Sequence, residues 1–201
     1  NEERTIGKVL ERLSSLGPPV PDGTGMGMTL EIIVVDDGSR DGTYAQISAF
    51  RPPAGNITFR ALRHDKNRGK GAAVRTALAA ATGDVVVIQD ADLEYDPADI
   101  PKLLEPIADG RADAVFGSRF LAGPHRVHLF WHRAGNYIVT LTSNILYIMN
   151  FTDIETGYKA MRRDILQGMN FRSNSFDIEP EITAKLCRRR CRIYEVPISY
   201  S

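Results

Sequence analysis

The decapeptide LEIIVVDDGS, residues 30–39, joins a β-branched apolar run to two carboxylates, a glycine and a serine. Such a run is typical of a strand that is buried in a parallel sheet, and the Asp-Gly-Ser sequence after it predicts the loop into which the strand opens. The pattern recurs in VVVIQDADLE, residues 85–94, where four apolar residues precede three acidic ones. Two strands that end in carboxylates therefore indicate both the fold class and the place of the functional site.

Helical and strand patterns alternate on either side of these two stretches. The predicted strands lie at 30–35, 57–62, 85–88 and 112–117, and the predicted helices at 5–16, 41–50, 70–81, from 96 onward and at 131–149. Gly and Pro between 17 and 27 predict a flexible loop. This alternation predicts an α/β fold in one domain, with a mostly parallel central sheet and helices on both of its faces.

Length and composition exclude several classes of protein. A chain of 201 residues suits one domain with a substantial core. Hydrophobic residues make up 43% and charged residues 25%, which excludes disordered and collagen-like classes. Twenty-five basic residues balance 25 acidic ones, so a nucleic-acid partner is not expected. Cys187 and Cys191 have no second ligand pair nearby and indicate free thiols in a reducing compartment such as the cytoplasm.

Acidic residues follow two of the predicted strands. Ligands of open α/β sheets bind beyond the carboxyl ends of the strands, so Asp36, Asp37, Asp90 and Asp92 are expected to converge on one crevice. Unpaired carboxylates would repel one another there. A hard divalent cation held by carboxylate oxygens, Mg²⁺ or Mn²⁺, removes that repulsion. The alternative is that these acids cap helices and form turns.

The chain also carries an ordered series of motifs. They are VVDDGSRDGT (34–43), NRGKGAAVR (67–75), DADLE (90–94), GSRF (117–120), DIETGYK (153–159), FDIEPE (176–181) and EVPI (195–198). This series resembles the family 2 glycosyltransferases with the GT-A fold, in the branch of the dolichyl-phosphate mannose and glucose synthases. The resemblance covers almost the whole chain and implies a metal-dependent, inverting transfer of a hexose. The donor would be a nucleotide sugar of the UDP-glucose or GDP-mannose type, and the acceptor a polyprenyl or dolichyl phosphate.

The resemblance implies a role for each matching residue. The residues that would contact the nucleotide sugar are Glu2, Asp36, Asp37, Lys70 and Asp90. Among these, Lys70 would be available to a phosphate. Asp92 and Glu94 would hold Mg²⁺ or Mn²⁺ together with diphosphate oxygens of the donor. The cation neutralises the charge that develops on the departing nucleoside diphosphate.

The acceptor side is indicated by an uneven spread of charge. Residues 117–149 contain no carboxylate but include Arg119 and Arg133, in contrast to the acidic stretch before them. The resemblance places these two arginines against a lipid phosphate, which suits a bidentate guanidinium. A lipid phosphate is already ionised, whereas a sugar hydroxyl must lose its proton to a carboxylate. Asp153 and Glu155 match the positions where family members with hydroxyl acceptors keep that base, so both acceptor classes stay open.

The predicted helix at 131–149 is rich in large apolar residues. They are Ile138, Leu141, Ile145, Leu146 and Ile148. Most of them are expected to pack in the core, and the alternative is a helix that lies in a membrane interface. With a lipid acceptor, the chain is expected to work at the cytoplasmic face of a membrane.

Two departures from the family pattern bear on the domain and its function. The family normally begins with a hydrophobic strand, and many members continue into transmembrane helices. This chain begins at Asn1 and has no apolar stretch of the roughly 18–20 residues that span a bilayer. Residues 1–201 are therefore expected to be a catalytic domain that lacks its first strand and any C-terminal membrane region. A non-catalytic nucleotide-sugar-binding domain is the second hypothesis, and a dehydrogenase is disfavoured because no Gly-x-Gly-x-x-Gly follows the first available strand.

Overall fold

The computed structural model describes residues 1–16, 29–53, 55–121 and 130–200, with the backbone alone at 130–133. Its strands are β1 (Leu30–Asp36), β2 (Ile57–Arg63), β3 (Val85–Val87), β4 (Ala114–Ser118), β5 (Lys159–Arg162) and β6 (Ile193–Pro197). Its helices are α1 (Ile6–Ser14), α2 (Thr43–Ala49), α3 (Lys70–Ala80), η1 (Pro97–Asp99), α4 (Ile100–Ala108), α5 (Phe130–Tyr147), α6 (Arg163–Leu166) and α7 (Ile178–Arg188). The predicted strands and helices are confirmed, and the predicted loop at 17–27 lies outside the described residues.

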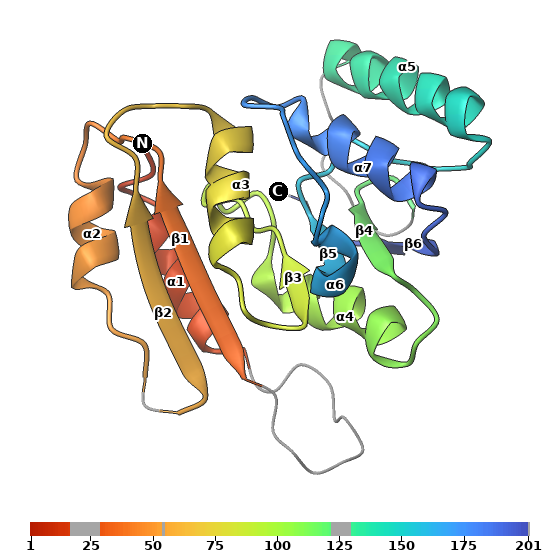
Figure 1. The fold of residues 1–201 in the computed structure, drawn as a ribbon. Coiled ribbons are helices and arrows are strands. Elements are labelled where there is room, and N and C mark those ends of the chain that lie inside the picture. The colour runs from red at the N-terminus through yellow and green to blue at the C-terminus, as the bar shows by residue number, and fades with distance from the viewer. Residues whose placement is uncertain (17–28, 54, 122–129, 201) are drawn as a thin grey trace.

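The described strands form two sheets (Figure 1). β1 and β2 pair in parallel, from Leu30 opposite Ile57 to Asp36 opposite Arg63. The second sheet has the order β3-β5-β4-β6, in which β4 and β6 are parallel and β5 runs antiparallel to both of its neighbours. The α/β class is therefore confirmed. The sheet is mixed, however, because the two strands that the sequence pattern did not predict, β5 and β6, complete it.

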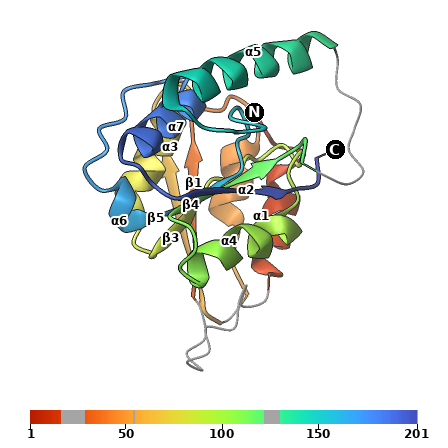
Figure 2. The same cartoon turned by 90° about the vertical axis from the view of Figure 1, so that its right-hand side faces the viewer.

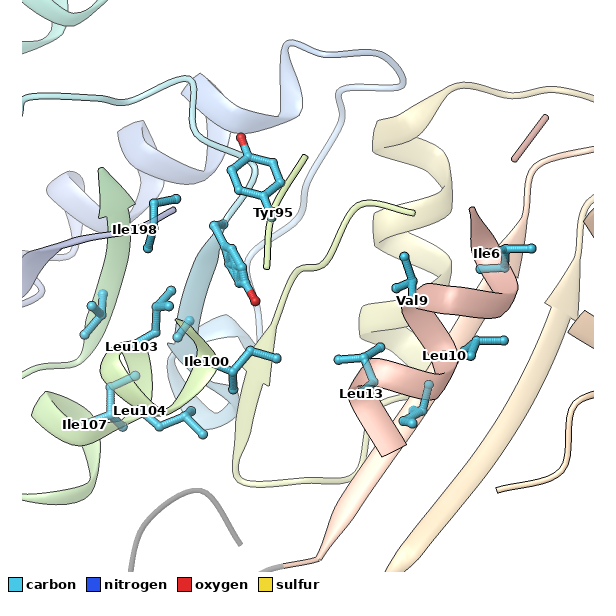
Figure 3. Close-up of a cluster of buried hydrophobic side chains, with 14 of the residues drawn as sticks. Ile6, Val9, Leu10, Leu13, Tyr95, Ile100, Leu103, Leu104, Ile107 and Ile198 are labelled. Atoms are coloured by element: carbon cyan, nitrogen blue, oxygen red, sulfur yellow. The ribbon is translucent and has the colours of Figure 1, made fainter. Parts of the chain in front are cut away.

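The two sheets are joined by side chains. Within the described ranges, β1 pairs with β2 alone and β3 with β5 alone, so no ladder of backbone hydrogen bonds crosses from one sheet to the other. The apolar face of α1, which includes Val9 and Leu13, fills this junction and packs in one cluster with Ile32 of β1 and Ile100 of α4 (Figure 3). The contact between the sheets is therefore mainly apolar.

Helices cover both faces of the four-stranded sheet (Figure 2). β4 shows why, because all its residues are buried and successive side chains of a strand point to opposite faces. Val115 belongs to the cluster formed with α1 and α4, whereas Ala114 and Phe116 belong to the cluster formed with α6 and α7. The prediction of helices on both faces is confirmed.

Helix α5 has the reverse of the usual amphipathic pattern. Its inward positions include Asn136 and Thr140, each 5% exposed. Its outward face carries large apolar side chains, with Ile138 63%, Ile145 70% and Leu146 68% exposed. The prediction that most of these residues pack in the core is wrong, because the buried face of the helix is occupied by polar side chains. Among the described helices, none is both long and apolar enough to cross a bilayer.

Candidate active site

A cavity of about 340 Å³ lies beyond the carboxyl ends of β3 and β4, beside the starts of α3 and α7 and against α5. The structure brings six of the predicted site residues together in its lining: Lys70, Asp90, Asp92, Glu94, Arg119 and Glu155. The sequence pattern assigned no role to the other lining residues, which are Tyr95, Phe120, Asn136, Gly157, Phe176, Glu179 and Tyr200. Segments up to 130 positions apart in sequence therefore meet at one polar hollow.

The carboxylates of Asp90, Asp92 and Glu94 form one wall of the cavity, called here the acidic wall. Asp92 Oδ1 accepts a hydrogen bond from the backbone N–H of Glu94 at 3.0 Å, and the residue between them, Leu93, has the left-handed φ of 67°. Strained backbone of this kind persists where surrounding structure holds it, often at functional sites. Loss of hydration in the cavity, followed by the charges of Asp90 and Glu94, raises the pKa of Asp92. The wall therefore concentrates negative charge that a cation would relieve.

The carboxylates also decide what kind of metal site is available. In the described part of the chain, no three side chains of His, Cys, Asp or Glu gather closely enough to hold an ion. Asp92 and Glu94 supply hard oxygen ligands, and Glu94 is oriented by the Tyr200 hydroxyl, which donates to its Oε2 at 2.6 Å. This donor set fits Mg²⁺ or Mn²⁺ if a ligand brings further oxygens. A diphosphate is a ligand of that kind.

Lys70, the first residue of α3, lines the cavity. Its ammonium lies 2.8 Å from Asp90 Oδ2 and 3.0 Å from Glu179 Oε1, and these two carboxylates outweigh burial and raise its pKa. Gly157 packs directly on this pair, because a Cβ at that position would stand 2.5 Å from Asp90 Oδ2 and 3.2 Å from the Lys70 ammonium. A Cβ at 157 would therefore push the Asp90 carboxylate away from its present position beside Lys70.

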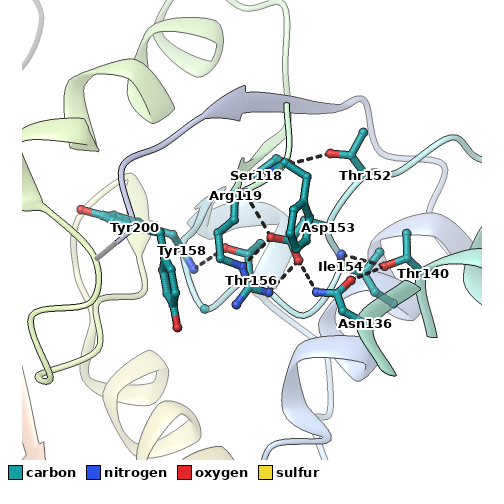
Figure 4. Close-up of polar contacts among 12 residues, drawn as sticks. Ser118, Arg119, Asn136, Thr140, Thr152, Asp153, Ile154, Thr156, Tyr158 and Tyr200 are labelled. Atoms are coloured by element: carbon teal, nitrogen blue, oxygen red, sulfur yellow. Dashed lines mark hydrogen bonds and ion pairs between the residues drawn. The ribbon is translucent and has the colours of Figure 1, made fainter. Parts of the chain in front are cut away.

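Arg119 and Asp153 face each other on the opposite side (Figure 4). Arg119 donates from Nε to Asp153 Oδ2 at 2.7 Å and from Nη2 to Oδ1 at 2.8 Å, a bidentate pair. Asn136 adds a third side-chain donor to Asp153 Oδ1 at 2.7 Å. Asp153 is completely buried, whereas the Arg119 side chain keeps 14% exposure and lines the cavity. Burial acts against its charge, but the Asp153 carboxylate outweighs burial and raises the pKa of Arg119.

Asp36 and Asp37 lie outside the cavity lining and hold loops. Asp37 accepts hydrogen bonds from the backbone N–H groups of Arg68 at 2.9 Å and Gly69 at 2.7 Å, and its Oδ1 lies 2.6 Å from His64 Nδ1. These bonds outweigh burial and lower the pKa of Asp37. Asp36 is buried, accepts from the backbone of Ser39 at 3.2 Å and pairs with Arg63 at 3.1 Å. Asp37 therefore shapes the loop that leads directly into Lys70.

Two further predicted residues are not found in the cavity lining. Glu2 precedes α1, where its carboxylate accepts a hydrogen bond from the Thr5 hydroxyl at 2.9 Å and its backbone N–H donates to Thr43 at 2.8 Å. Its contacts are thus with α1 and α2. The side chain of Arg133 lies outside the described residues.

Glu179 and Asn136 are residues that sequence reasoning missed. Glu179 shares a helix face with Ile182 and Leu186, so a carboxylate stands at the spacing of an apolar stripe. An acid at such a position signals a buried ion pair. Asn136 gave no comparable signal, because its partner Asp153 is 17 positions away and joins it only through the tertiary fold.

An α/β fold with a polar cavity beyond the carboxyl ends of its strands is the arrangement in which open sheets bind their ligands. The family model described as "Glycosyl transferase family 2" matches residues 1–169, so the chain belongs to that family. It is 28% identical over 203 residues to a dolichol-phosphate mannosyltransferase of Pyrococcus furiosus, covering 100% of this chain and 54% of the relative. It is 32% identical over 178 residues to an undecaprenyl-phosphate mannosyltransferase of Micrococcus luteus, covering 85% of this chain and 71% of the relative. The chain therefore spans about half the length of the first relative.

Solved structures agree with this fold. Glucosyl-3-phosphoglycerate synthase from Mycobacterium tuberculosis in complex with UDP has a TM-score of 0.70 and 25% identity, over 100% of this chain and 68% of that one. The same enzyme with Mn²⁺, UDP-glucose and phosphoglyceric acid has a TM-score of 0.73 and 24% identity, over 100% and 67% of the two chains. The GT-A fold is thus common to this chain and an enzyme that binds a nucleotide sugar.

Proposed function

We propose that the chain transfers a hexose from a nucleotide sugar to a polyprenyl phosphate. One observation carries this proposal: a single cavity has the carboxylates of Asp92 and Glu94 on one wall and the guanidinium of Arg119 on another. The first wall suits a cation with a diphosphate, and the second suits an anionic acceptor. The names of the Pyrococcus and Micrococcus relatives support a lipid phosphate as that acceptor.

The donor side would use the acidic wall and the lysine beside it. Asp92 and Glu94 would hold Mg²⁺ or Mn²⁺, and the bound cation would stabilise charge on the nucleoside diphosphate as it leaves. Lys70 and Asp90, which are already paired, would face the phosphate and sugar portions of the donor. The loop at 67–71, held by Asp37, would lie against the nucleotide, and the remaining predicted contacts, Glu2 and Asp36, stay predictions for the nucleoside.

The acceptor side would use Arg119, with Asp153 as the residue that orients it. The two hydrogen bonds from Arg119 to Asp153 fix the plane of the guanidinium. An ionised phosphate held there can attack the anomeric carbon without losing a proton, so the mechanism needs no general base. Arg133 stays a predicted second contact to the phosphate.

A hydroxyl acceptor is the second candidate. The mycobacterial synthase, which was solved with phosphoglyceric acid, supports an acceptor of this kind. Asp153 is a poor base in the described geometry because it is completely buried and accepts from Arg119 and Asn136. Glu155 is exposed and lines the cavity, so it would be the base for a hydroxyl acceptor.

A transfer assay tests the proposal. The chain would be given UDP-glucose or GDP-mannose, with a polyprenyl phosphate or a sugar acceptor, in the presence and absence of Mn²⁺. We expect metal-dependent transfer to the lipid phosphate, and Asp92→Asn should abolish most of it while Asp65→Asn, an exposed acid outside the cavity, has no effect. Transfer only to the hydroxyl acceptor would favour the second candidate, and donor binding without transfer would favour a non-catalytic binding domain.

We also propose that the outward face of α5 lies on the cytoplasmic surface of a membrane. The face is formed by Tyr137, Ile138, Leu141, Ile145 and Leu146. Asn136, on the inward face of the same helix, lines the cavity, so α5 carries a residue of the proposed phosphate site on one face and the apolar surface on the other. A polyprenyl chain whose phosphate enters the cavity would need such a surface beside it. A lipid bilayer is therefore the partner that matches the proposed acceptor.

Vesicle binding tests this second part. Full burial of an Ile side chain is worth about 1.5–3 kcal/mol, and Ile138 and Ile145 are 63% and 70% exposed in the chain alone. Replacing both by Ser should therefore cost about 2–4 kcal/mol and weaken binding to phosphatidylcholine and phosphatidylglycerol vesicles by roughly 30–1,000-fold. Tyr194→Ser is the matched control, because Tyr194 is an exposed aromatic residue on β6. Unchanged binding of the double variant would contradict a role for this face.

A further inference from the structure

A completely buried lysine lies behind the cavity. Lys159, the first residue of β5, has 0% exposure. Its ammonium donates to the backbone carbonyls of Ile154, at 3.0 Å, and Thr156, and to Glu179 Oε2 at 3.1 Å. A buried charge is costly unless it is paired and hydrogen-bonded, and this one is both. The proposed reaction does not use Lys159 directly.

Glu179 connects this lysine to the cavity. Its second oxygen, Oε1, lies 3.0 Å from the Lys70 ammonium, which itself lies 2.8 Å from Asp90 Oδ2. Burial acts to raise the pKa of Glu179, but the two ammonium groups outweigh burial and lower it. Four charges of alternating sign thus run from Asp90 through Lys70 and Glu179 to Lys159.

Lys159 also holds the segment at 153–158, which forms the other side of the cavity. The two carbonyls that accept from its ammonium flank Glu155, which lines the cavity. The same segment begins with Asp153, the partner of Arg119, and contains Gly157, which packs on Asp90. One ammonium group therefore contacts both the carboxylate that holds Lys70 and the backbone that presents Asp153.

We propose that Lys159 is a positioning residue that couples the donor and acceptor sides of the active site. It sets the place of Lys70 and Asp90 through Glu179, and it sets the place of Arg119 through the segment at 153–158. The inference rests on the proposed function and deepens it. Without the ammonium, Glu179 would be neutralised by Lys70 alone and would draw it away from Asp90. The freed Asp90 charge would then repel the diphosphate of the donor.

A purely structural lysine would behave differently from a positioning one. If Lys159 only filled the core, its replacement would lower the melting temperature and leave the Michaelis constants of the folded protein unchanged. If it positions both sides, the Michaelis constants change. Which of them changes depends on whether the contact to Glu179 or the contacts to the backbone are removed. Glu179→Gln removes the carboxylate that fixes Lys70 and pairs with Lys159, but keeps the bonds from Lys159 to the carbonyls of 154 and 156. Lys159→Met removes the link to Glu179 and the link to the backbone together.

The experiment measures UDP and GDP affinity by calorimetry with Mn²⁺, together with KM for donor and acceptor. We expect Glu179→Gln to weaken donor binding about fivefold to tenfold, the lower range of usual coupling between sites, with acceptor KM unchanged. Lys159→Met should raise KM for the donor and for the acceptor. A variant with both Glu179→Gln and Lys159→Met should bind donor no more weakly than the weaker-binding of the two single variants. Lys102→Met is the matched control, because Lys102 pairs with the buried Asp99 outside the cavity.

The outcomes separate this inference from the proposed function. Failure of the wild-type chain to bind any nucleoside diphosphate would overturn both. Normal binding by the wild type, with unchanged constants in Lys159→Met or additive losses in the double variant, would overturn the role of Lys159 alone. If Lys159→Met does not fold, Glu179→Gln decides, since unchanged donor affinity in that variant refutes the link to Lys70.

Discussion

Replacing Asp153 by Asn keeps the shape of the side chain and removes one charge from a bidentate ion pair. Asp153 accepts at 2.7 Å from Arg119 Nε, at 2.8 Å from Nη2 and at 2.7 Å from Asn136, so the new amide would direct an N–H at one of these donors. Removing one partner of a buried pair costs about 3–5 kcal/mol. Because the Arg119 side chain retains 14% exposure, water can solvate the freed guanidinium. We therefore expect a loss near the lower end, about 3 kcal/mol, in the free energy of unfolding measured with urea.

The kinetic effect of Asp153→Asn distinguishes its two possible roles. If Asp153 orients Arg119 toward a phosphate, the loss should appear mainly as a higher KM for the acceptor, by roughly 10–100-fold, since each tenfold corresponds to about 1.4 kcal/mol. If it is a general base for a hydroxyl, kcat itself should fall by roughly 10²–10⁴-fold. Steady-state transfer, measured well below the melting temperature of the variant, separates these cases.

A double-mutant cycle completes the test. If Asp153 acts through Arg119, then Asp153→Asn should add little to the loss already present in Arg119→Ala, because the residue to be oriented is gone. Arg51→Ala, an exposed arginine just after the end of α2 and outside the cavity lining, is the control for loss of positive charge. Additive losses in kcat for the two substitutions would refute the orienting role and restore Asp153 as a candidate base.

Three further predictions concern other parts of the molecule. Gly157→Ala should displace the Asp90 carboxylate and so weaken donor binding, measured by calorimetry, about tenfold. Gly83→Ala, whose Cβ would meet nothing closer than 3.7 Å, should leave donor binding unchanged. Glu181 is partly buried, which raises its pKa, but the backbone N–H groups that donate to it lower the pKa to about 2. It should therefore contribute about 1–2 kcal/mol of stability at neutral pH, after solvent screening, that is lost as pH falls from about 4.5 to about 2; an equal effect of Glu181→Gln on urea unfolding at pH 7 and pH 2 would contradict this. Leu103→Ala, at 0% exposure, should lower the free energy of unfolding by about 2–5 kcal/mol, and a loss below 1 kcal/mol in the same urea assay would show that the core there collapses to fill the space.

Local patterns in the sequence predicted the elements whose cause is local. β1 is a continuous β-branched run, and α1 has its apolar residues at helical spacing, so each could be recognised without its neighbours. β5 could not, because its sequence Lys-Ala-Met-Arg lacks a strand pattern. It becomes a strand because β3 and β4 both pair with it, and its lysine is tolerated there because Glu179 lies against it.

The candidate site shows the same division. Carboxylates at strand ends could be predicted from the sequence, and Asp90 and Asp92 do line one cavity. The sequence did not reveal which charges pair with each other. Arg119 and Asp153 stand 34 positions apart, and only the fold shows that they form one unit. The same holds for Asp37, whose carboxylate accepts from the backbone of the loop at 67–71, because only the fold brings that loop next to it.

The junction between the two sheets has a consequence for how the molecule opens. A ladder of backbone hydrogen bonds fixes its strands in discrete registers, but apolar contacts have no direction and allow small sliding. The pair β1–β2 is held to the rest of the described structure largely by the packing of α1 and α3, so it forms a unit that can separate without breaking the four-stranded sheet. Amide protons of β1 and β2 should therefore exchange with deuterium through a lower-energy opening than those of the central strand β4. Shortening Leu13 of α1 to Ala should accelerate exchange in β1 and leave the protection of β4 nearly unchanged.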